Sequence, residues 1–147
     1  MKYFTFIFAL IISSAAFWFS IKFIRLYFRV KKWDRVIAHV TSKELFIHPK
    51  YSKSRSPYGL KVEYWYQVKN IDYTGHMVYL IELSGGQANH MKSVAKNKLN
   101  KIDKTMTIYV NPNDPSQSVM FCDGIGLYLF VFFMGFVSLL IGLSKIL

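Results

Sequence analysis

The chain has 147 residues, a formal net charge of +11, 52% hydrophobic and 18% aromatic residues. This length allows one small domain at most beside any membrane spans, and the single cysteine excludes an intramolecular disulfide. Nucleic-acid binding is not expected either, because residues 33–123 hold twelve basic and eight acidic residues, a net of only +4.

Two uncharged apolar runs, residues 3–21 and 125–143, lie near the two ends of the chain. At about 1.5 Å per residue each is long enough to cross a hydrocarbon core of roughly 30 Å. The sequence therefore predicts an integral membrane protein with two transmembrane helices. Gly135 and Gly142 predict that the second helix packs closely against the first.

The segment 22–35, directly after the first run, is strongly basic. Four of its cations recur at spacings of three and four, which predicts a basic amphipathic juxtamembrane helix: Lys22, Arg25, Arg29 and Lys32. Two interpretations stay open. These residues either only stop translocation or contact the headgroups of anionic membrane lipids.

The same charges predict the orientation of the chain. Six Lys or Arg lie between Lys22 and Arg35, so the positive-inside rule places the central domain in the cytoplasm and the spans in the cell (inner) membrane. The competing interpretation is a cleaved signal peptide, since residues 1–16 end in the small residues SSAA. Against it, the apolar run continues through residues 17–19, which makes it longer than the hydrophobic region of a typical signal peptide.

Residues 36–121 are predicted to form a β-rich (α+β) domain. In residues 60–68 apolar side chains alternate with polar ones, so Tyr64 and Tyr66 should face the core and Trp65 the other side. A turn at 70–72 leads into an expected partner strand at 73–82. Further strands are expected at 36–47, 106–110 and 118–121, and a helix at 87–102.

Residues 49–57 read as a polar loop between two strands. The loop carries three cations, Lys50, Lys53 and Arg55. Loops on a rigid sheet commonly carry binding residues, so these three are a candidate partner-binding site. The alternative is a solvated connection without a function of its own.

Three sequence segments together suggest a family. They are VEYWYQV at 62–68, YTG at 73–75 and IYVNPNDPSQSV at 108–119, followed by the second span. In these segments the chain resembles the domain-of-unknown-function 3592 family of small membrane proteins. The resemblance implies a small β-rich insert between two spans and brings no reaction, cofactor or partner. One departure is KIDK at 101–104, where we would expect a glycine before the strand.

The sequence offers no convincing catalytic or metal-binding set. Ser93 and Lys96 have a serine–lysine spacing without the accompanying motifs, and the four histidines are never three or four residues apart. We therefore expect no cofactor and a non-enzymatic membrane protein that binds a protein partner in a regulatory, accessory or toxin-immunity role. The alternatives are a lipid-interacting structural protein of the envelope and, third, a membrane-bound enzyme.

Overall fold

The computed structural model describes residues 2–47 and 58–144. The chain divides into two compact units, one formed by Met1–Arg29 with Gly124–Leu147 and the other by Val30–Asp123. The first unit is helical and the second contains the sheet. Each is described by itself.

The helical unit consists of two long apolar helices, α1 (Lys2–Lys31) and α3 (Ile125–Ser144). α1 runs on into the first residues of the second unit. Both helices are long and apolar enough to cross a membrane. Their large apolar side chains remain exposed, for example Trp18 at 79% and Leu127 at 64%. An apolar helix that is not covered by protein is unlike the core helix of a soluble domain.

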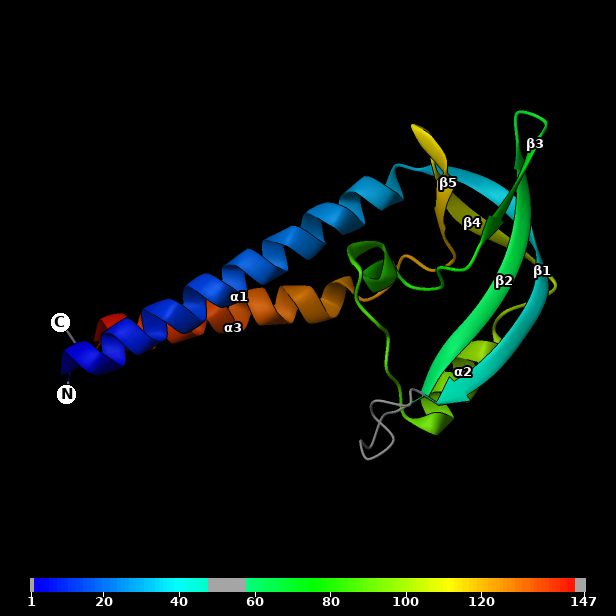
Figure 1. Cartoon of the computed structure of the whole chain (residues 1–147). Helices are drawn as coiled ribbons and strands as arrows, with labels where there is room; N and C mark the ends of the chain where they lie inside the picture. Colours follow the sequence, from blue (N-terminus) through cyan, green and yellow to red (C-terminus); the bar gives the residue numbers. More distant parts are fainter. Residues whose placement is uncertain (1, 48–57, 145–147) are drawn as a thin grey trace. The chain divides into compact units, whose positions relative to one another are not determined.

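The two helices lie side by side in this unit (Figure 1). A Cβ atom added at Gly142 would lie 2.8 Å from the Cβ of Ala9, and one at Gly135 would lie 3.0 Å from the Cβ of Ala16. The rings of Phe23 and Tyr128 stack with centroids 4.5 Å apart. The predicted close packing at the glycines of the second apolar run is thus confirmed.

The second unit is built on a five-stranded antiparallel sheet of order β3-β2-β1-β4-β5 (Figure 1). The long strand β1 is central and pairs with both β2 and β4. The strands are β1 (Asp34–Ile47), β2 (Tyr58–Val68), β3 (Ile71–Gly75), β4 (Thr105–Asn111) and β5 (Asp114–Val119). Two long apolar helices near the chain ends therefore flank a β-rich domain, as expected from the sequence.

The core lies on one face of this sheet and follows the alternation in β2. Val62, Tyr64 and Tyr66 are almost completely buried, whereas Trp65 is 43% exposed on the opposite face, which confirms the predicted register. The hydroxyls of these two tyrosines are satisfied: that of Tyr66 donates to the carbonyl of Pro115 at 2.6 Å, and that of Tyr64 lies 3.0 Å from the Ser118 hydroxyl. Two tyrosines thus tie the hairpin to β5.

The expected strand 73–82 is wrong beyond residue 75. β3 ends at Gly75, and residues 77 and 78 pair instead with the chain directly after β5. The amide of Met120 donates to the carbonyl of Met77 at 3.1 Å, and that of Phe121 donates to the carbonyl of Val78 at 2.8 Å. A short 3₁₀-helix, η2 (Leu80–Ser84), follows. Long-range pairing has replaced the local hairpin.

Three other elements also have bounds that differ from those expected. α2 (Lys92–Asn100) is shorter than the expected helix 87–102, because the backbone of His90 is held extended by two hydrogen bonds to Tyr58. β5 begins at Asp114, four residues before the expected strand 118–121, after a turn in which the side chain of Asn111 accepts the amide of Asn113. The first helix ends at Lys31 rather than 35, because β1 begins at Asp34.

Candidate functional site

The face of the sheet opposite the core carries a strip of side chains from β1, β2 and β4, exposed except for the half-buried Tyr109. We call it the outer strip and define it by five residues: Arg35, Ile37, His39, Trp65 and Tyr109. Alternation along each strand places them on this face, and the register places His39 opposite Trp65 and Arg35 opposite Tyr109. The central position of β1 therefore brings together residues from three strands.

The members of the outer strip contact one another in two cross-strand pairs. The rings of His39 and Trp65 stack with centroids 4.6 Å apart, and the guanidinium carbon of Arg35 lies 5.7 Å from the centre of the Tyr109 ring. Ile37, between these pairs, is 62% exposed. The strip is thus held in a fixed arrangement while its apolar surface stays open to solvent.

Residues of these types are typical of protein interfaces. Trp, Tyr and Arg are enriched among the residues that dominate binding energy, and a rigid aromatic loses little conformational entropy on binding. The same side chains also stabilise the sheet modestly through each cross-strand pair, and the β-branched Ile37 favours the extended backbone of a strand. The exposure of Ile37 therefore supports an interface only together with its aromatic and cationic neighbours.

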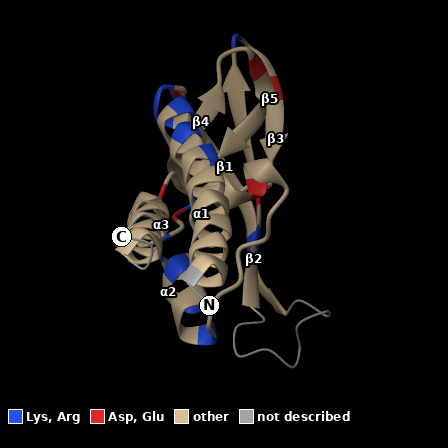
Figure 2. Cartoon of the chain, turned by 90° about the vertical axis from the view of Figure 1, so that its left-hand side faces the viewer, with Lys and Arg blue, Asp and Glu red and all other residues tan. Residues whose placement is uncertain are grey.

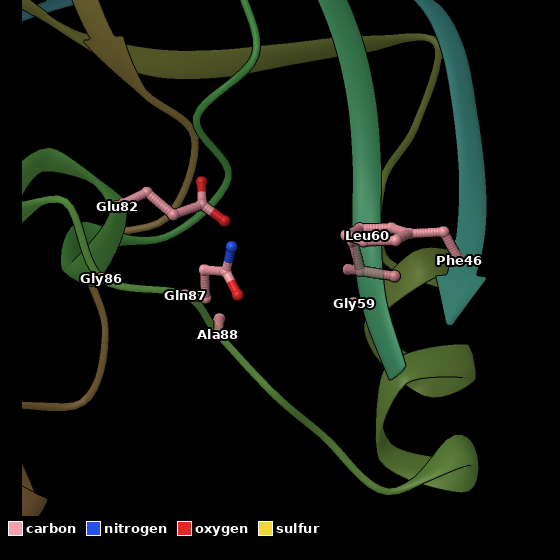
Figure 3. A pocket seen from close by; sticks show the side chains of 7 residues that line it. All are labelled: Phe46, Gly59, Leu60, Glu82, Gly86, Gln87 and Ala88. Carbon is pink, nitrogen blue, oxygen red and sulfur yellow. The ribbon is translucent and has the colours of Figure 1, made fainter. Parts of the chain in front are cut away.

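A cavity of about 220 Å³ lies on another side of the domain (Figure 3). Figure 3 shows the carboxylate of Glu82 and the amide of Gln87 on one side and the side chains of Phe46 and Leu60 on the other. Gly59, Gly86 and Ala88 complete its lining.

The carboxylate in this cavity already has a structural role. Glu82 accepts the backbone amides of Val78 at 2.6 Å and Tyr79 at 3.3 Å, which caps η2. Burial raises the pKa of Glu82, and these two hydrogen bonds partly offset the rise. Neither a hydroxyl nor a thiol lines the cavity within the described ranges, and its one carboxylate is engaged by the two backbone amides.

The basic residues predicted to contact lipid headgroups lie at the end of the first helix. Lys22, Arg25 and Arg29 are exposed on α1, and Lys32 is exposed directly after it. Figure 2 shows Lys and Arg positions in blue along the part of α1 that leads to β1. The structure thus places them together on the chain between the apolar part of α1 and the sheet.

The predicted partner-binding loop, with Lys50, Lys53 and Arg55, lies outside the described residues. The sequence had placed Trp65 on the outer face but had not grouped it with Ile37, His39 and Tyr109. The available signal was the alternation in β1 and β4, which becomes informative only when the two strands are known to be neighbours.

The described part of the chain contains no cluster of three His, Cys, Asp or Glu residues that could hold a metal ion. Comparison with family models, with curated proteins and with solved structures finds no match to this chain. Membership of the domain-of-unknown-function 3592 family therefore stays a prediction.

Proposed function

We propose that this chain is a non-enzymatic integral protein of the cell (inner) membrane, with two spanning helices and a central domain that binds a protein partner. The observation that carries the proposal is the outer strip, in which the exposed Ile37 lies between two cross-strand pairs and the exposed Trp65 belongs to one of them. A regulatory, accessory or toxin-immunity role fits such a module.

The membrane part of the proposal is supported by the exposed apolar surfaces of α1 and α3. In water such surfaces would cost about 25 cal/mol for each Å² left exposed, whereas in lipid they carry no such cost. The six cations between Lys22 and Arg35 favour a cytoplasmic domain.

The charge of the domain favours an acidic partner. The net charge of residues 33–123 is +4, and opposite charge speeds the encounter of two proteins while the apolar contacts slow their dissociation. Arg35 would meet an acidic group at the edge of the strip, and Lys50, Lys53 and Arg55 of the loop remain a second candidate contact.

The proposal can be tested by photo-crosslinking of the full chain in its native membrane. A photoreactive residue at Ile37 or at Trp65 should give the same discrete product with an acidic protein, and one at the exposed turn residue Asn113 should not. Trp65→Ala should in addition weaken the product formed from position 37. Products of equal yield at all three positions, or none at 37 and 65, would contradict the proposal.

A further inference from the structure

We propose that a second cavity of the sheet unit binds a phosphate ester that also carries an ammonium group, the chemistry of an aminophospholipid headgroup. The cavity has a volume of about 50 Å³ and five lining residues: Tyr79, Lys98, Lys101, Phe121 and Asp123. The inference rests on the proposed function in one respect only, the insertion of α3 into a membrane.

A side chain of the sheet helps to fix the helix end that carries the two lysines. Lys98 lies in the last turn of α2 and Lys101 is the C-cap residue of that helix. The ammonium of Lys43, on β1, donates to the carbonyls of Leu99 (3.2 Å) and Ile102 (2.5 Å). This link binds the carboxyl end of α2 to the sheet and so fixes the backbone from which both cavity lysines project.

Charges of both signs line the cavity without neutralising one another. Lys98 places its ammonium 4.4 Å from the centre of the Tyr79 ring. Burial lowers the pKa of Lys98, while the charge of Asp123 raises it and that of Lys101 lowers it. Within the described part of the chain, neither lysine forms an ion pair with Asp123. The cavity thus offers two cations for an anion and a separate carboxylate for a cation.

A basic residue in the last turn of a helix is common, because it complements the helix dipole. That explanation accounts for the charge of Lys98 but not for its position over an aromatic ring in a cavity that also contains Lys101 and Asp123. The grouping of the three charges, and not the presence of any one, is what points to a ligand.

Tyr79 contributes the face of its aromatic ring to the cavity. Its side chain is only 7% exposed, and its hydroxyl, which has no hydrogen-bond partner among the described residues, is itself buried. The cavity is therefore lined by the ring, with the Lys98 ammonium 4.4 Å from the ring centre, and not by the hydroxyl.

The chain itself keeps the cavity near the start of the second span. Asp123 is two residues before Ile125, where α3 begins, so their Cα atoms are at most about 7.6 Å apart. If α3 crosses a bilayer, Asp123 lies close to the headgroup layer, where phosphates and ammonium groups are concentrated. Lys98 and Lys101 would then hold the phosphate and Asp123 the ammonium.

The test uses the full chain in detergent micelles and calorimetric titration with three probes: short-chain phosphatidylethanolamine, short-chain phosphatidylglycerol and soluble phosphoethanolamine. Lys98→Gln with Lys101→Gln should weaken phosphatidylethanolamine binding by at least about tenfold. Lys92→Gln with Lys96→Gln, which removes the same charge from exposed positions of α2, should leave it unchanged. Asp123→Asn should weaken phosphatidylethanolamine but not phosphatidylglycerol.

The outcomes show whether the ligand comes from the bilayer or from solution. They also distinguish a failure of the proposed site from a failure of the proposed membrane insertion. If phosphoethanolamine binds as tightly as the lipid, the site is supported and its ligand is soluble; if only the lipid binds, the bilayer supplies it. Wild-type affinity of the Lys98/Lys101 double variant for phosphatidylethanolamine overturns the site. If the double variant is unstable, Asp123→Asn still tests the site, because Asp123 is exposed and its replacement should not disturb the fold. Release of the protein from membranes by alkaline carbonate would instead overturn the membrane insertion.

Discussion

Replacement of Tyr66 by alanine should unfold much of the sheet unit at temperatures where the wild type is stable. Tyr66 is fully buried, its ring stacks on that of Tyr73 at 5.8 Å, and its hydroxyl donates to Pro115 at 2.6 Å. Truncation of a buried aromatic residue costs about 3–5 kcal/mol. For a unit of about a hundred residues this lowers Tm by more than about 12 °C.

The matched control is Trp65→Ala, which removes a larger aromatic side chain from the neighbouring position of the same strand. Trp65 is 43% exposed, and its ring contact is the stacked imidazole of His39. Its loss should therefore cost about 1 kcal/mol or less, the value of one cross-strand pair. Thermal unfolding followed by circular dichroism, together with the amount of protein in the membrane, measures both variants.

Tyr66→Phe separates the ring from the hydroxyl. It keeps the packing and removes only the hydrogen bond to Pro115, so it should cost about 0.5–1.5 kcal/mol. Equal losses for Trp65→Ala and Tyr66→Ala would refute the assignment of the two faces. A Tyr66→Phe variant as unstable as Tyr66→Ala would show that the hydroxyl, and not the packing of the ring, dominates.

Three further predictions concern other parts of the chain. Gly142→Leu should separate α1 from α3, because an added Cβ would already lie 2.8 Å from the Cβ of Ala9. Disulfide crosslinking between cysteines placed on the two helices should then fall, whereas replacement of an exposed leucine of α3 by alanine should leave the crosslinking unchanged. Burial raises the pKa of Glu82 above its usual 4.5, so the folded state holds the carboxyl proton more tightly than the unfolded state does. The free energy of unfolding should therefore decrease as pH rises through and above 4.5. Unfolding measured as a function of pH should lose this decrease in the Glu82→Gln variant. Ser54→Cys in a Cys122→Ser background should resist an impermeant thiol reagent in intact cells and react after lysis if the domain is cytoplasmic, whereas strong labelling of intact cells would place it outside.

The sequence was most informative where a single period governs a segment. Strict alternation in 60–68 predicted which side chains of β2 are buried, because a strand with one face in the core must alternate. The apolar runs predicted α1 and α3 for a similar reason, since length and composition can be read from the run itself and set whether a helix is long and apolar enough to cross a bilayer. Neither prediction needed knowledge of the rest of the fold.

The errors lie where distant segments compete for the same backbone groups. Residues 77 and 78 have a strand-like composition, but they pair with 120 and 121 rather than with β2. At the end of β3, a Cβ on Gly75 would meet the side chains of Tyr64 and Ser118, at 2.6 Å from the Ser118 hydroxyl, so the close approach of these segments requires glycine. No local pattern carries such information.

The candidate site was hidden for the same reason. Ile37 and His39 are ordinary outward residues of one strand, and Tyr109 belongs to another that lies about seventy residues further along the chain. They become a surface only because β1 is the central strand between β2 and β4. The order of strands in a sheet depends on non-local pairing, which the alternation of a single strand does not encode.

The edges of the sheet help to decide how a partner would bind. A partner that adds a strand needs a long free edge. The edge strands β3 and β5 have only five and six residues, and Pro115 removes one backbone donor from β5, which is a common protection against pairing with another chain. β1 and β2 run past these neighbours, because β4 pairs only with residues 34–39 of β1 and β3 only with residues 64–68 of β2. The two modes of binding can be told apart by mutation: if the side chains of the outer strip carry recognition, proline substitutions in β3 should affect stability and Trp65→Ala should affect binding.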